Sequence, residues 1–264
     1  MANILDEIFK KASALNKTVV LPEGEDKRVV TAAADIVKKG IAKIVLLGDE
    51  EEIKKRITLY KRCARDRSRD TLHGVFLDIS VASKDPVIRD YSRKKVEQSM
   101  AIAQELGVKG VVFHSGLIGG LNQEEYLRHW YETQEALWDE MLTKYTQLTV
   151  YMENTFENTP DSLAELKRRL RKHERFQLCL DYGHACLGPT EPDKWFAQMN
   201  GNIGHIHIND NDLISDLHMV PGSGSIDFTY FKKLTERYDV NCPILLEVTG
   251  IEKQKKALEY MSAL

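Results

Sequence analysis

Five short apolar runs in this chain of 264 residues each end in side chains that bind metal ions or move protons. Short apolar runs bounded by turn signals are typical of strands buried on both faces. Carboxylate and imidazole groups contributed by separate strands are suitable ligands for a divalent ion. The sequence therefore predicts metal-dependent proton transfer by the side chains that end these runs, which are His114, Glu153, Asp181 followed by His184, His207 and Glu247.

Further ligand-type residues lie near these ends. His73 ends an earlier apolar run, and Asp216 and His218 follow the strand that contains His207. A single such histidine usually makes a structural hydrogen bond, and a single strand-end carboxylate often caps the next helix. Several strands would each need the same accident, so the set favours a common site. His205 is expected one layer deeper, in the core. No cysteine is expected to be placed to bind the metal.

The elements that must position these residues alternate along the chain. We expect strands at 17–22, 41–48, 72–79, 110–114, 148–153, 177–181, 203–208, 217–220 and 244–248. We expect helices at 3–13, 25–39, 50–60, 86–106, 123–145, 160–171, 192–199, 227–238 and 251–263. Alternation of this kind predicts parallel β-α-β units. The expected fold is α/β, a TIM-type (β/α)8 barrel over 59–264, preceded by a β-α-β-α unit over 1–58 that replaces the usual first barrel strand.

Composition limits the class of protein. The net charge is −3, so bulk electrostatics do not favour binding to a polyanion. The four cysteines form no CxxC pair, which favours reduced thiols over a disulfide framework. No run of eighteen apolar residues and no N-terminal apolar leader occurs, so a cytoplasmic protein without membrane contact is expected. A homo-oligomer is left open.

The first fifth of the chain resembles the opening of phosphate acetyltransferases. The match lies in residues 15–28, LNKTVVLPEGEDKR, and residues 40–54, GIAKIVLLGDEEEIK. The segments that carry coenzyme A and acetyl phosphate chemistry in that family are not found here. The resemblance therefore implies local structure rather than acetyl transfer, and the chain looks like a chimera.

From about Leu72 to Leu264 the chain resembles the sugar phosphate isomerase/epimerase superfamily of TIM barrels, which xylose isomerase-like enzymes share with endonuclease IV. The motifs that carry this match are HGVF at 73–76, FHSG at 113–116, MENT at 152–155, LDYGHA at 180–185, HIHIND at 205–210, DLHMVPG at 216–222 and LEV at 246–248. The family's first strand and helix are not recognisable. We expect Ile41–Gly48 to take the first barrel position.

The resemblance implies roles for these residues. One divalent ion (Mn, Mg, Co or Zn) would be held by Glu153, Asp181, His207 and Glu247. Glu153 and Glu247 would also move a proton at the carbon beside a carbonyl, and His184 would contact a substrate oxygen. In endonuclease IV the matching positions hold a zinc cluster that includes four further residues. These four, taken here as substrate-binding residues, are His73, His114, Asp216 and His218.

Three functions remain open on this basis. The favoured one is isomerisation or epimerisation of a small sugar, sugar phosphate or related hydroxyketone. The second is zinc-dependent cleavage of abasic DNA, and the third is a non-catalytic fusion protein that keeps a metal site. Nucleic acid is disfavoured because the loops after the ligand residues contain few cations, and the basic clusters at 54–69 and 167–175 precede strands.

Overall fold

The computed structural model describes residues 18–21, 43–46, 50–62 and 68–264. The helices expected at 3–13 and 25–39 lie outside these residues, as does Cys63. The chain divides into two compact units, Met1–Arg65 and Asp66–Leu264, which are taken separately below. The boundary expected between residues 58 and 59 lies within a helix, α3, and remains a proposal.

The first unit contains two parallel strands and a helix. β1 (Thr18–Leu21) pairs with β2 (Lys43–Leu46), and α3 spans Glu50–Arg62. β2 is the partner of β1 in a two-stranded parallel sheet, and the expectation that Ile41–Gly48 takes the first barrel position stays a prediction. An apolar strand pattern specifies burial but not a partner, and the strand close by in sequence is the partner that β2 takes.

The second unit is built on one parallel sheet of six strands, in the order of the sequence. The strands are β3 (Thr71–His73), β4 (Gly110–His114), β5 (Thr149–Glu153), β6 (Phe176–Asp181), β7 (Ile203–Ile208) and β8 (Ile244–Leu246). The helices are α4 (Pro86–Leu106), α5 (Glu124–Lys144), α6 (Asp161–Arg169), α7 (Tyr182–Leu187), α8 (Pro192–Met199), α9 (Phe228–Arg237) and α10 (Ile251–Ala263).

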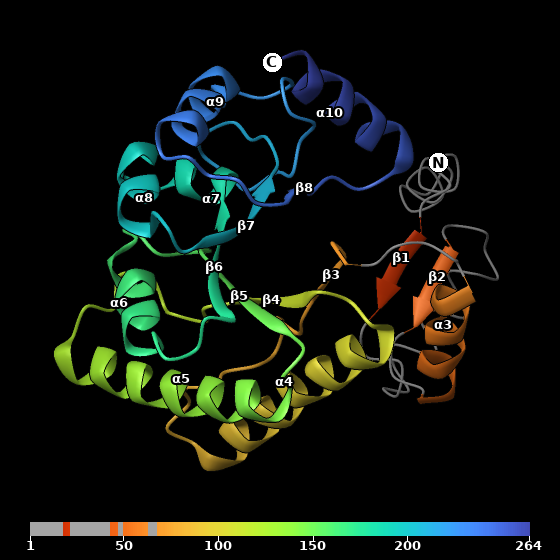
Figure 1. Ribbon diagram of the computed structural model, residues 1–264, viewed down its shortest axis with the longest axis vertical. Coiled ribbons are helices and arrows are strands. Elements are labelled where there is room, and N and C mark those ends of the chain that lie inside the picture. Colours follow the sequence, from red (N-terminus) through yellow and green to blue (C-terminus); the bar gives the residue numbers. More distant parts are fainter. Residues whose placement is uncertain (1–17, 22–42, 47–49, 63–67) are drawn as a thin grey trace, which may run out of the picture. The chain divides into compact units, whose positions relative to one another are not determined.

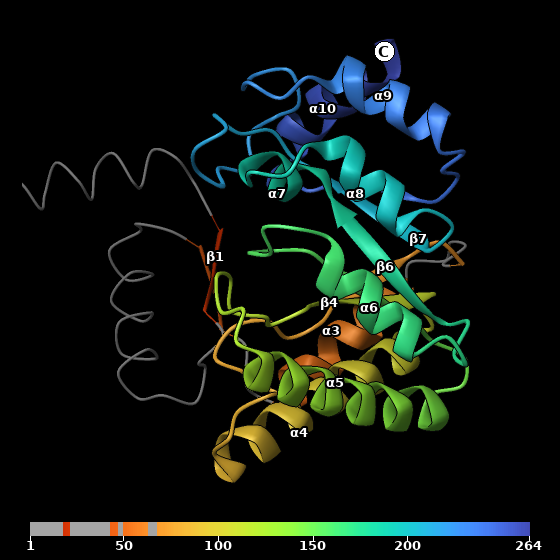
Figure 2. The same cartoon turned by 90° about the vertical axis from the view of Figure 1, so that its left-hand side faces the viewer.

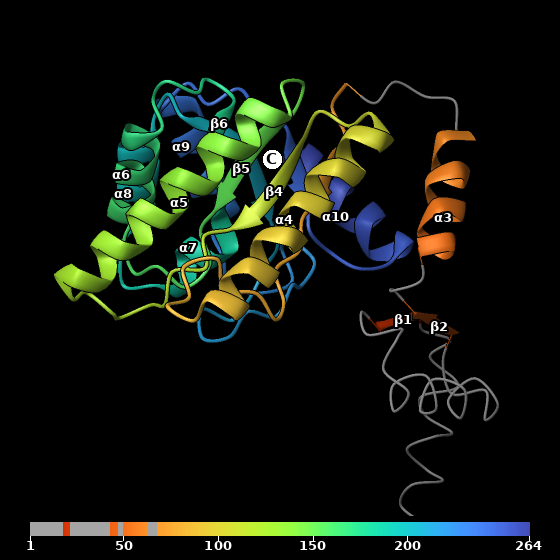
Figure 3. The ribbon, with the colours of Figure 1, turned by 90° about the horizontal axis from the view of Figure 1, so that it is seen from below.

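The sheet curls, and the helices follow one another around its outer face (Figure 1). Figure 3 shows α4 and α5 side by side across β4 and β5. This arrangement of parallel strands and outer helices confirms the predicted TIM-barrel architecture. Within the described residues the sheet has two edges, β3 and β8, so its six strands form an open arc.

Helix ends follow local signals in the sequence. At the start of α4 the Asp85 carboxylate accepts a hydrogen bond from the Val87 N–H at 2.8 Å. The same helix ends at Gly107, whose φ of 70° lies in the left-handed region that glycine adopts without strain. The apolar faces of the helices pack on the sheet, and the largest buried side chains include Trp130, Trp138 and Phe113.

Three local expectations were wrong. The strand expected at 72–79 is shorter, because β3 ends at His73. Residues 217–220 form no barrel strand, and Met219 makes only an isolated antiparallel bridge to Asp210. The sequence also missed α7, a short helix that lies directly beyond the end of β6 (Figure 2). Among the described residues, none of the helices is both long enough and apolar enough to cross a membrane.

Candidate metal centre

The register of the sheet places the ligand-type residues side by side at the carboxyl ends of the strands. His114 on β4 pairs with Glu153 on β5, and Asp181 on β6 pairs with His207 on β7. Glu247 follows β8, and its N–H donates to the Ile208 carbonyl at 2.8 Å. Since all six strands are parallel, their carboxyl ends form one mouth.

The central group consists of Glu153, Asp181, His207 and Glu247, whose ligand atoms all lie within 4.8 Å of one another. Nδ1 of His207 lies 3.0 Å from Oε1 of Glu153 and 3.3 Å from Oε2 of Glu247. Glu153, Asp181 and His207 are buried, and Glu247 is partly exposed. The four residues that the sequence predicted as ligands are therefore brought together.

This group fits a divalent cation. One carboxylate oxygen of Glu153 and one of Glu247, both Oε2, are buried without a hydrogen-bond donor. An unpaired buried carboxylate oxygen is costly, and a cation removes that cost. Three carboxylates and one imidazole match the donors preferred by Mn²⁺, Mg²⁺ and Zn²⁺.

Two further groups lie beside the central one. Nε2 of His73 and Nε2 of His114 approach Oε2 of Glu153 at 3.4 and 3.5 Å. On the other side Oδ2 of Asp216 lies 3.2 Å from Nε2 of His184 and 3.3 Å from Nε2 of His218. Every residue that the sequence predicted for the site thus belongs to one of three groups around a single mouth.

Proton affinities in the mouth reflect its crowded carboxylates. Burial, together with the nearby Glu153, raises the pKa of Asp181 to about 7. Burial also disfavours the charged form of His184, but Asp181 and Asp216 outweigh it and raise the pKa of this histidine to about 10. Burial would raise the pKa of Glu153, yet the hydrogen bond from His207 to Oε1 and the nearby His73 imidazole lower it. In the metal-free mouth, protons on histidines and on Asp181 offset the carboxylate charge.

One cysteine lies beside the ligand groups, although the sequence predicted none at the metal, and that prediction stays a prediction. The Cys179 sulfur lies within 4.8 Å of ligand atoms of Glu153 and His207. Cys179 precedes Asp181 by two residues on β6, so both side chains point to the same face of the sheet. His205 holds the equivalent position on β7 and is buried, as predicted, with no partner for either ring nitrogen. These two residues form a layer beneath the metal ligands.

Sequence reasoning missed the residues that orient Asp181. The Asn154 side chain accepts from the Asp181 N–H at 2.8 Å and donates to the Asp181 carbonyl at 3.0 Å. Oδ1 of Asp181 accepts the His184 N–H at 2.7 Å, which also caps α7. Asn209 donates to Oδ2 at 3.2 Å. The signal was available, because Asn154 follows the strand-end residue Glu153 and Asn209 follows the strand that contains His207.

The loop between β7 and α9 is organised by a buried carboxylate. Asp210 accepts hydrogen bonds from the N–H groups of Gly222, Gly224 and Ile226, at 2.8 to 3.1 Å. The loop also carries Asp216 and His218. A carboxylate that binds several backbone N–H groups fixes loop geometry strongly, so Asp210 determines where these two residues lie.

Comparison with known proteins agrees with this geometry. A family model described as Xylose isomerase-like TIM barrel matches residues 30–264. The probable endonuclease 4 of Persephonella marina is 25% identical over 219 residues, which are 75% of each chain. Phosphate acetyltransferase of Acetivibrio thermocellus is 54% identical over 52 residues, which are 20% of this chain and only 16% of that enzyme. The predicted N-terminal resemblance is confirmed as a partial match.

Solved structures show the same fold. The TTHB071 protein from Thermus thermophilus, soaked with ZnCl2, has a TM-score of 0.67 at 20% identity and covers 94% of this chain and 97% of its own. A D-tagatose 3-epimerase-like protein has a TM-score of 0.67 at 22% identity, covering 81% of this chain and 82% of its own. At these identities the likeness extends to architecture alone.

Proposed function

The chain belongs to the xylose isomerase-like TIM-barrel family, and we propose that it is a divalent-metal-dependent isomerase or epimerase of a small sugar or related hydroxyketone. Glu153, Asp181, His207 and Glu247 hold the ion in this proposal. The observation that carries it is the convergence of these four residues, with two buried carboxylate oxygens left unpaired. Epimerase-like proteins among the structural neighbours support the same reaction class.

The chain's own residues supply the proton transfer. A bound divalent ion polarises the substrate carbonyl and so makes the hydrogen on the adjacent carbon more acidic. Glu153 and Glu247 are the carboxylates placed to remove that proton and return it. His184 donates its Nδ1–H to the Asn154 carbonyl at 2.9 Å, which fixes the ring and keeps its Nε2 edge toward Asp216 and the mouth. In this role His184 hydrogen-bonds a substrate oxygen.

Metal content and hydrogen exchange test the proposal together. We expect about one or more divalent ions per chain after purification in Mn²⁺ or Zn²⁺, and deuterium incorporation beside the carbonyl of ketoses in D2O, followed by NMR. Glu153→Gln should reduce exchange by at least about 100-fold, because it removes a general base. Exchange that is unchanged in this variant would exclude the assigned role. Metal retained without any exchange would support a non-catalytic fusion.

Zinc-dependent cleavage of abasic DNA is a second candidate function. It is favoured by the two flanking groups, because His73, His114, Asp216 and His218 add ligands for more than one ion, and by the similarity to a probable endonuclease 4. An abasic duplex incubated with the zinc-loaded protein tests it. Chelator-sensitive nicking of the duplex, with no exchange into ketoses, would replace the isomerase proposal.

A further inference from the structure

The described loops around the mouth contain few cations and expose several large apolar side chains. The described loops that follow β3 to β8 contain one lysine, Lys84, and no arginine. Lys84 pairs with Glu125 at 3.1 Å. The same loops contain several acidic residues, Asp78, Glu157, Asp212 and Asp216 among them. A phosphate group therefore meets no unpaired lysine or arginine in these loops.

Helix N-termini, the other usual phosphate-binding element of such barrels, already carry carboxylates. Asp85, Asp181 and Asp227 accept backbone N–H groups at the starts of α4, α7 and α9. The other described helices of this unit have acidic residues in the first turn, namely Glu124 and Glu125 in α5, Asp161 in α6, Asp193 in α8 and Glu252 in α10. A phosphate would have to displace or oppose a carboxylate at each of these ends.

The loops instead expose large apolar side chains. Eight of the seventeen large apolar side chains exposed in the described residues lie in the four loops after β3, β4, β5 and β7. We call them the apolar rim: Phe76, Leu77, Ile118, Leu121, Phe156, Leu213, Ile214 and Leu217. Exposed apolar patches of this kind mark binding surfaces. Phe156 and Ile214 are 77% and 84% exposed, so they contribute little to packing within the fold.

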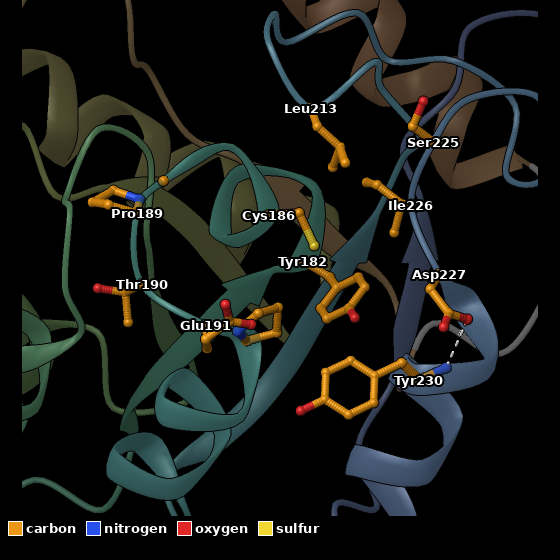
Figure 4. A pocket seen from close by; sticks show the side chains of 12 residues that line it. Tyr182, Cys186, Pro189, Thr190, Glu191, Leu213, Ser225, Ile226, Asp227 and Tyr230 are labelled. Carbon is orange, nitrogen blue, oxygen red and sulfur yellow. Dashed lines mark hydrogen bonds between the residues drawn. The ribbon is translucent and has the colours of Figure 1, made fainter.

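The apolar rim meets the metal centre at Phe76. The Phe76 ring lies 5.1 Å from the His73 ring and 5.0 Å from the His114 ring, measured between centroids. At Leu213 the rim reaches a cavity of about 270 Å³. Figure 4 shows Leu213 and Ile226 on one side of this cavity and the rings of Tyr182 and Tyr230 on another. The charged side chains that line the cavity, Glu191 and Asp227, are both acidic.

We propose that the substrate is an uncharged polyol that carries an apolar group, as a glycoside or sugar ether does, rather than a phosphate ester. Its oxygens face the metal ligands, and its apolar group lies on the apolar rim. The inference rests on the proposed function and narrows its substrate class. Four carboxylates belong to the ligand groups of the mouth, and the described loops around it offer no unpaired lysine or arginine to an anion. An apolar group buries rim surface that a bare sugar leaves in water.

Binding of three matched ketoses tests this inference: the 6-O-methyl ether, the 6-O-benzyl ether and the 6-phosphate of D-fructose. They share their metal-facing oxygens and differ at one position. On Mn²⁺-loaded protein we expect the benzyl ether to bind about tenfold tighter than the methyl ether, a fraction of the gain from full burial of a phenyl ring. The phosphate should bind at least about threefold more weakly than the methyl ether.

A rim variant and a matched control locate the effect. Phe156→Ser combined with Ile214→Ser should reduce the benzyl-to-methyl advantage to about twofold or less. Leu258→Ser removes an apolar side chain of α10 that is 60% exposed and lies outside the mouth loops, and should leave the tenfold advantage unchanged. If the rim variant still binds the benzyl ether about tenfold tighter than the methyl ether, the apolar rim is not the surface that binds the benzyl group.

The outcomes separate the inference from the proposed function. Metal content is measured first on each sample, and a protein without metal contradicts the proposed function. In a metal-loaded sample, tighter binding of the phosphate, or no gain from the benzyl group, overturns the inference alone. Salt-dependent binding of an abasic duplex in preference to all three ketoses would also overturn it and favour the nuclease. No binding of any ketose to metal-loaded protein contradicts both.

Discussion

At the scale of single residues, the structure shows that Cys179 lies beneath the metal-binding His207, which residue types did not reveal. Nδ1 of His207 faces two carboxylates, while its Nε2 is buried without a hydrogen-bond partner. The Cys179 sulfur is close to this ring and is the weak polar group that β6 supplies there. A partner for the second ring nitrogen fixes the tautomer and orientation of a metal-binding histidine.

We therefore predict that Cys179→Ala weakens metal binding on the order of tenfold. Cys179→Ser retains a polar atom at this position and should restore most of the affinity. Competition with a chromophoric chelator measures both. Cys242→Ala is the matched control, because this free cysteine belongs to none of the ligand groups, and it should leave the affinity unchanged. Equal affinities in all three variants would show that Cys179 has no positioning role.

At the scale of elements, most helices and strands follow from periodicity and helix-end signals. The strand at 110–114 and the helices at 86–106, 192–199 and 251–263 have the predicted bounds. The structure shows that the loop after β7 is held in place by hydrogen bonds to Asp210, which the sequence analysis did not predict. Long-range hydrogen bonds from backbone N–H groups to a carboxylate leave no periodic pattern in the sequence, so this anchoring could not be predicted.

Asp210→Ala should loosen this loop without unfolding the sheet. The change leaves four backbone N–H groups without their acceptor, which costs about 2 to 4 kcal/mol in unfolding free energy if they stay buried. Hydrogen exchange should increase at residues 211–226 and remain slow in β4 to β7. Asp212→Ala is the control, because its carboxylate is exposed and accepts only local N–H groups. Unchanged exchange in Asp210→Ala would contradict the anchoring role.

At the scale of the whole molecule, metal binding to the crowded carboxylates should increase the free energy of unfolding. A ligand present at 100 times its Kd stabilises the folded state by about 2.7 kcal/mol, which is about 5 to 10 °C in Tm for a unit of this size. We predict that a chelator lowers Tm by that amount, measured by calorimetry. Glu153→Gln should remove most of this difference, and a Tm insensitive to chelator in the unaltered protein would contradict metal binding.

The metal-induced increase in Tm should also depend on pH. Since the pKa of Asp181 is raised to about 7 in the metal-free fold, protons compete with the metal below that pH. The sign follows from linkage: without metal, the folded chain holds this proton more tightly than the unfolded chain, so its stability falls as pH rises from about 4 to 7. The Tm difference between metal-loaded and metal-free protein should therefore grow over the same interval.

The sequence by itself determined the alternation of strands and helices, the class of fold and the ligand-type residues at the strand ends. These follow from local patterns, because burial and helix-end chemistry repeat along the chain. Only the tertiary structure decided that β2 pairs with β1, that Cys179 lies beside His207, and that large apolar side chains in four loops after the strands are exposed. Such facts depend on which residues far apart in sequence come together, and no local pattern encodes a partner.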